Sequence, residues 1–251
     1  MKPLIFSSLL FGMFFCGAQS RSLSKKASVT PANLDSLIEF EKSFTAHYRA
    51  AAPAGTNWFE FKKGERDILL LAPHATAQTR QGKIKVADRG TGSLAVELNK
   101  LCDVHVLYTT YLSPSDPNYY DNNAFKDSLA QLLLRLKPIL VIDLHASAES
   151  RPYDVDFGTM NGISLGIKSQ LLDSLIVQLH ECGIMNLSSN YFSAAINHTD
   201  TKFVHNRGVP CIQLEINENY LRPDQGGYFR QNSAKLLEAL TRFIELIELP
   251  K

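Results

Sequence analysis

Near the middle of the chain runs Ile139-Leu-Val-Ile-Asp-Leu-His145-Ala-Ser147, and this run predicts the centre of the fold. Apolar residues fill five of its first six positions, which is typical of a strand buried inside a parallel sheet. Asp143 and His145 are two residues apart, so a strand places them on one face. A histidine at the carboxyl end of such a strand lies where open α/β sheets place their chemistry. The alternative is a core histidine that is hydrogen-bonded to Asp143.

Similar patterns recur on both sides of this run. Apolar runs predict strands over residues 67–72, 104–108 and 208–217, and the alternation of Asp154 and Asp156 with Val155 and Phe157 predicts a short strand with one polar face. Helical periodicity predicts helices over residues 34–48, 91–100, 125–136 and 167–179, and from residue 233 onward. We expect long loops over 75–92 and 190–206. Strands that alternate with helices predict a single three-layer α/β domain, in which a mixed, mostly parallel sheet carries helices on both faces.

The composition is that of an ordinary globular protein. The chain has 251 residues, of which 45% are hydrophobic and 20% charged, and its net charge is +1. So small a net charge gives no electrostatic reason to expect nucleic acid as a partner.

The first 20 residues resemble a signal peptide. Lys2 precedes an apolar run over residues 4–15, and Ala18-Gln-Ser20 matches a small-residue cleavage site. We therefore divide the chain into a leader (1–20), an arm with a first helix (21–55) and a catalytic α/β domain (56–251). The protein is expected to be exported to the periplasm or secreted, with no membrane span in the mature chain. A lipid anchor on Cys16 is the alternative, although the flanking residues match it poorly.

Residue types that commonly bind metals lie where the predicted strands end. His74, His145 and Glu215 lie at or near the ends of three strands, and Asp88 lies in the loop after the first. Two imidazoles and a carboxylate form a three-ligand catalytic zinc site, and a further carboxylate can act as general base. Spacing alone is weak evidence, because the chain has no HExxH helix and no CxxC pair. Asp88 could instead serve a turn before the next helix.

Five short motifs, taken together, resemble the N-formylglutamate amidohydrolase family. They are Leu-Ala-Pro-His74, Asp88-Arg-Gly-Thr-Gly92, Ile-Asp-Leu-His145, Arg151-Pro-Tyr-Asp-Val-Asp-Phe-Gly-Thr159 and Ile-Gln-Leu-Glu215-Ile-Asn. They fall within residues 67–222, in the order found in the family. That family is similar in turn to the zinc carboxypeptidase and succinylglutamate desuccinylase group. The resemblance implies a phosphorylase/hydrolase-like fold with zinc as cofactor.

The resemblance also implies roles for single residues. His74 and His145 would bind zinc, and Glu215 would be the general base. The family's acidic ligand usually follows the first histidine closely, but Ala77 and Gln78 occupy those positions here. The first carboxylate is Asp88, which we therefore expect to be the third ligand.

Other polar residues are candidates for binding the substrate. Arg151 would steady the oxyanion or bind a substrate carboxylate, unless it pairs with Asp154 or Asp156 on the surface. We expect Asp143 to orient His145 rather than to bind metal. The remaining candidates for the substrate pocket are Asn118, His198, His205 and Arg207.

The preferred hypothesis is an exported zinc-dependent amidohydrolase. It would cleave an N-acyl or γ-glutamyl amide of a carboxylate-bearing amino acid or short peptide. The departure at Ala77 and Gln78 motivates an alternative, a secreted binding protein that keeps the fold without turnover. A metal-independent serine hydrolase built on Ser147 is a third hypothesis, but no GxSxG elbow surrounds that residue.

Overall fold

The structure, a computed structural model, describes residues 29–247. The expected leader over residues 1–20 and the first part of the expected arm lie outside the described residues. Within that range no helix is both long enough and apolar enough to cross a membrane.

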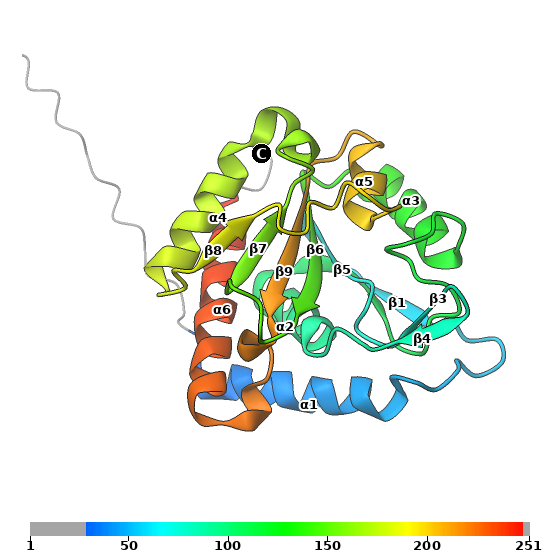
Figure 1. Ribbon diagram of the computed structural model, residues 1–251, viewed down its shortest axis with the longest axis horizontal. Helices are drawn as coiled ribbons and strands as arrows, with labels where there is room; N and C mark the ends of the chain where they lie inside the picture. Colours follow the sequence, from blue (N-terminus) through cyan, green and yellow to red (C-terminus); the bar gives the residue numbers. More distant parts are fainter. Residues whose placement is uncertain (1–28, 248–251) are drawn as a thin grey trace, which may run out of the picture.

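One sheet of seven strands forms the centre of the molecule (Figure 1). Its strands, in the order in which they lie side by side, are β1 (Phe59–Lys62), β5 (Val104–Thr109), β2 (Arg66–Ala72), β6 (Leu140–Ser147), β9 (Cys211–Asn217), β7 (Val155–Gly158) and β8 (Leu187–Ser189). The four central strands are parallel, whereas β1 and β7 run antiparallel to their inner neighbours. The prediction of a mixed, mostly parallel sheet is confirmed.

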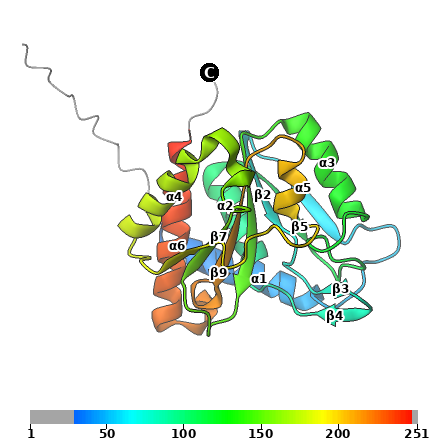
Figure 2. The same ribbon diagram turned by 45° about the horizontal axis from the view of Figure 1, so that its top comes forward.

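Helices cover both faces of this sheet. One face carries α1 (Pro31–His47), α2 (Thr91–Cys102), α4 (Gln170–Glu181) and α6 (Gly227–Leu246), and the other carries α3 (Ala124–Leu136) and α5 (Asp200–His205). Figure 2 shows α3 and α5 together, apart from α4 and α6. Three short 3₁₀ turns complete the fold, namely η1 (Ile163–Lys168), η2 (Glu218–Tyr220) and η3 (Pro223–Gln225).

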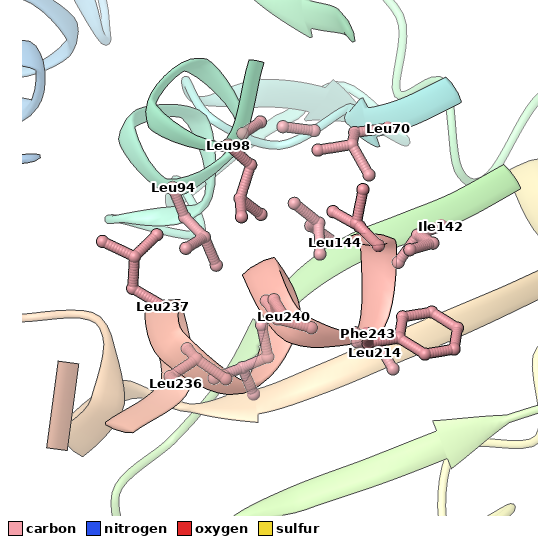
Figure 3. Packing of buried hydrophobic residues seen from close by; sticks show 14 of the residues in the cluster. Leu70, Leu94, Leu98, Ile142, Leu144, Leu214, Leu236, Leu237, Leu240 and Phe243 are labelled. Carbon is pink, nitrogen blue, oxygen red and sulfur yellow. The ribbon is translucent and has the colours of Figure 1, made fainter. Parts of the chain in front are cut away.

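Toward the carboxyl ends of β6 and β9, apolar side chains point to one face of the sheet and polar side chains to the other. Ile142 and Leu144 in β6, like Leu214 in β9, point into the core beneath α2 and α6 (Figure 3). The other alternate residues of these strands therefore point to the α3/α5 face, and they include Asp143 and His145. This explains how a strand buried on both faces can hold polar side chains at its carboxyl end.

The larger core lies between this sheet and the helices α2 and α6. Leu94 and Leu98 of α2 and Leu237, Leu240 and Phe243 of α6 belong to this cluster, in which Leu237 lies near Leu94 and Phe243 lies near Leu214 of β9 (Figure 3). All these side chains are buried. Leu34, Leu37 and Phe44 extend the same core into α1.

Two expected loops contain regular structure. Residues 75–92 hold a hairpin of β3 (Gln78–Arg80) and β4 (Lys83–Lys85), and residues 190–206 hold α5. Both expectations were wrong because these elements are short and lack an apolar period. In addition α6 begins at Gly227, ahead of the residue 233 that we predicted, since its first turn lies before the first residue of its apolar stripe.

A substitution in this core tests the packing. Replacing Leu240, which is 1% exposed, with Ala should lower the free energy of unfolding by about 2–5 kcal/mol, because it removes apolar contacts and leaves a cavity. Leu134→Ala is the matched control on α3, where the side chain is 78% exposed, and it should change stability by no more than about 0.5 kcal/mol. Urea unfolding followed by circular dichroism measures both. Equal losses in the two variants would contradict this packing.

Candidate metal centre

Two buried histidines lie side by side at the carboxyl ends of neighbouring strands. His74 follows the end of β2, and His145 lies in β6, which pairs with β2 in parallel. Their ring centroids are 4.9 Å apart and the rings meet edge to face. Both residues are at most 5% exposed. The structure therefore brings together two histidines that the sequence places at the ends of two separate strands.

Asp88 lies between the two imidazole rings. Its Oδ2 atom is 3.4 Å from Nδ1 of His74 and 3.0 Å from Nδ1 of His145. The backbone N–H groups hold it there, since Ala146 donates to Oδ2 and Asp88 itself donates to the His74 carbonyl. Gly90, with φ of +86°, lets the chain turn into α2 just after Asp88, where a Cβ atom would collide with the Leu221 carbonyl.

The outer nitrogen of each ring meets a second carboxylate. His74 Nε2 lies 2.9 Å from Asp116 Oδ1, and His145 Nε2 lies 3.1 Å from Asp143 Oδ1. A carboxylate only accepts, so both Nε2 atoms are donors and each Nδ1 atom is directed at Asp88. The predicted contact between Asp143 and His145 is confirmed, whereas Asp116 was not foreseen.

Glu215 stands beside this cluster on the adjacent strand. It pairs with His145 in the β6–β9 register, and Gln213 Nε2 donates to its Oε1 atom over 3.0 Å. Burial raises the pKa of the Glu215 carboxyl to about 7, although the positive charge of His145 opposes the shift. A carboxyl with such a pKa can take up and release a proton near neutral pH.

The close contacts between rings and carboxylates shift the pKa values of both histidines and of Asp88. Burial disfavours the charged ring of His74, but Asp116 and Asp88 outweigh it and raise its pKa to about 9. Burial also disfavours the charged ring of His145, but Asp143, Asp88 and Glu215 together outweigh it and raise the pKa of His145 well above its ordinary value. Burial would raise the pKa of Asp88, but hydrogen bonds from both rings lower it. Without a bound cation, protons on the two rings, together with the Arg80 guanidinium that pairs with Asp116, balance the three carboxylates.

The donor set fits a zinc ion. One nitrogen or oxygen from each of His74, Asp88 and His145 lies within 4.8 Å of the other two. Two imidazoles with one carboxylate are a known set for catalytic zinc and leave a position for water. Carboxylates behind the metal-binding histidines, as Asp116 and Asp143 are placed here, fix the ring orientation in such sites.

Two cavities open at Asp88. The first, which we call the hairpin cavity, has a volume of about 470 Å³ and reaches from the histidines to the β3–β4 hairpin. The second, the helix cavity, has about 490 Å³ and is lined by residues of α1, the loop before α2, the end of β6 and the η2–η3 segment, including Glu41, Arg89 and Arg222. Val86, Asp88 and Ala146 line both cavities, so the two cavities adjoin at the cluster.

The predicted substrate-binding residues do not all reach these cavities. Asn118 lines the hairpin cavity, where its Nδ2 atom is 3.3 Å from His145 Nε2. Arg151 is exposed and contacts Tyr191 and Phe192, two lining residues, through its guanidinium group, so it stands at the rim. It contacts those rings rather than Asp154 or Asp156.

Three other candidates lie outside the cavity lining. His198 is exposed and pairs with Asp121. His205 and Arg207 lie at the end of α5, on the approach to the amino end of β9, while Glu215 is near its carboxyl end. The structure does not bring these three residues to the cluster.

A buried lysine that was not among the predicted site residues is linked to the cluster through Asp200 and Asn118. Lys126 is fully buried on α3, and its Nζ atom is 3.3 Å from Asp200 Oδ1 and 2.9 Å from the His198 carbonyl. Asp200 N–H in turn donates to Asn118 Oδ1 over 2.7 Å. The only sequence signal was a lysine on the apolar side of a predicted amphipathic helix, next to Phe125.

Comparisons of the structure with known proteins show the fold that carries this site. N-formylglutamate amidohydrolase from Ralstonia eutropha JMP134 matches with a TM-score of 0.52 at 15% identity, over 75% of this chain and 97% of that one. A gene product from Agrobacterium tumefaciens matches with a TM-score of 0.54 at 13% identity, over 82% of this chain and 100% of that one. The resemblance drawn from the sequence motifs is confirmed for the fold. No protein-family profile matches the sequence, and the search of curated proteins returned no match.

Metal uptake should release protons from this cluster. His74 has a pKa of about 9 without metal, so at pH 7 its ring is protonated and must lose a proton before Nδ1 can bind zinc. Calorimetric zinc titrations at pH 7 in buffers of different ionisation enthalpy should give at least about one proton released per zinc. A binding enthalpy that is the same in every buffer would contradict the protonated cluster.

Proposed function

We propose that this protein is a zinc-dependent amidohydrolase with His74, Asp88 and His145 as metal ligands. One observation carries the proposal, namely that both Nδ1 atoms face one carboxylate while both Nε2 atoms are held by others. The similarity in fold to an N-formylglutamate amidohydrolase supports it. Zinc bound there would supply a Lewis acid that activates water and polarises a carbonyl group.

The protein's own residues then have separate tasks. Glu215 would accept a proton from the attacking water and pass it to the leaving nitrogen, for which a pKa of about 7 is suitable. Gln213 keeps the Glu215 carboxylate in place by donating to it. Asp116 and Asp143 hold the two rings in one orientation. Arg151 at the rim is a candidate for contact with the distal part of the substrate.

We propose an N-acyl or γ-glutamyl amide of a carboxylate-bearing amino acid or short peptide as the substrate. The hairpin cavity, at about 470 Å³, is of a size that takes such a small molecule. Export after removal of residues 1–20 remains a prediction from the sequence.

The two alternative functions find less support in the site. The absence of an acidic residue at Ala77 and Gln78 motivates a binding protein without turnover, but Asp88, from its own loop, lies between the two imidazole rings and can take the place of that residue. His145 directs its two ring nitrogens at Asp88 and Asp143, so neither is directed at Ser147 as a serine hydrolase would require.

Metal analysis tests the ligand set. Purified mature protein should hold about one zinc per chain, and His74→Ala and His145→Ala should lose it because each removes one ligand. His180→Ala is the matched control, since this histidine is exposed on α4, and it should keep its zinc. Elemental analysis after dialysis gives the result. Zinc retained in folded His74→Ala protein would contradict the assignment.

Substitution of the general base tests the chemistry. Glu215→Gln should keep zinc but lower kcat by about 10²–10⁴-fold, because the amide cannot accept the proton. The assay is a panel of N-acyl amino acids and γ-glutamyl peptides with the zinc-loaded protein. If wild-type protein hydrolyses no member of the panel, or if the variant matches the wild type, the proposed function fails.

A further inference from the structure

The β3–β4 hairpin lies, in the sequence, between His74 and Asp88, the first two proposed metal ligands. Its chain turns at Gln81 and Gly82, both with positive φ, which is the two-residue turn that matches the twist of a hairpin. Because the hairpin starts four residues after His74 and ends three residues before Asp88, its position is tied to the cluster at both ends.

The segment that holds Asp116 fixes the hairpin in place. Thr79 N–H donates to the Ser113 carbonyl over 2.9 Å, and Asp116 N–H donates to the Thr79 carbonyl over 3.0 Å. At the turn, Gln81 donates to the Tyr119 and Tyr120 hydroxyl groups. The hairpin is therefore a fixed wall of the site.

One face of the hairpin is basic and borders the hairpin cavity. The cross-strand pairs Gln78–Lys85 and Arg80–Lys83 share this face, because residues two apart and residues directly opposite point the same way. Gln78, Arg80 and Lys85 line the cavity. Two guanidinium nitrogens of Arg80 are engaged by Asp116. Among the described residues, no carboxylate lies within ion-pair distance of Lys85.

The charged residues that line the two cavities differ. Apart from His74, Asp88, His145 and Glu215 at the cluster, the charged residues of the hairpin cavity are Arg80 and Lys85. The helix cavity has two arginines but also the carboxylates Glu41, Glu218 and Asp224. In the helix cavity both arginines already pair with carboxylates, Arg89 with Glu41 and Arg222 with Glu218, so the hairpin side of the cluster is the more favourable one for an anionic group.

We propose that the β3–β4 hairpin selects the substrate, its basic face receiving a carboxylate group while the amide to be cleaved lies at the histidine–aspartate cluster. The second half of this statement rests on the proposed function, whereas carboxylate binding by the hairpin does not. Lys85 supplies the charge, since it is exposed and has no ion-pair partner within the described range, and Arg80 adds to it while bound to Asp116. Tyr191, Phe192 and Ile196 give the same cavity apolar surface for the carbon chain of the ligand.

Binding of a dicarboxylate to metal-free protein tests the hairpin without any need for turnover. The probes are glutarate and its neutral analogue glutaramide, titrated by calorimetry. Wild-type protein should bind glutarate more tightly than glutaramide. Lys85→Glu should weaken glutarate binding at least about fivefold and leave glutaramide unchanged, because an attraction becomes a repulsion. Lys85→Gln should lie between the two.

The matched control is Lys62→Glu, which makes the same change of charge at an exposed lysine of β1. It should bind both probes as the wild type does, and all variants should share the wild-type melting temperature. Glutarate binding that is equal in wild type and Lys85→Glu, or equally weakened in Lys62→Glu, would overturn the proposal. Failure of zinc binding or hydrolysis would leave this result standing, so the two proposals can fail separately.

Discussion

Two imidazole rings held between three carboxylates are the interaction on which the site depends. Asp116, His74, Asp88, His145 and Asp143 form one continuous chain of contacts of 2.9–3.4 Å in the interior. Burying this many charges is unfavourable unless each meets an opposite charge. Without metal, protons on the two histidines and the guanidinium of Arg80 on Asp116 provide that balance. A divalent cation in place of the two protons would keep the same total charge, so the arrangement fits a metal site.

The sheet supplies this chain of contacts by dividing its two faces. In β6 and β9 one set of alternate residues packs beneath α2 and α6, where large apolar side chains hold the strands in register. The other set is free to carry His145 and Glu215, side by side because the strands are parallel and in register. The packing and the chemistry thus share the same strands but occupy opposite faces.

The sequence predicts most of this sheet, because long apolar runs and parallel pairing leave few topologies. His74, Asp88, His145 and Glu215 follow from the ends of those runs together with the family resemblance. Asp116 could not be predicted, since it lies in a Pro-rich segment and meets His74 only through tertiary folding. The hairpin was missed because its strands are three residues long and largely polar. Arg207 was predicted to line the substrate pocket, but it lies just after α5, before the amino end of β9, whereas the cluster lies at the carboxyl ends of the strands.

The position of a bound metal tests this account most directly. Crystals of the protein grown with zinc can be measured at the zinc absorption edge, where anomalous scattering locates the ion. The account predicts one peak at about 2.0–2.1 Å from Nδ1 of both His74 and His145 and about 2.0–2.2 Å from Asp88, with Asp116 and Asp143 still on the Nε2 atoms. A peak elsewhere, or one bound through Nε2 with those two carboxylates displaced, would contradict it.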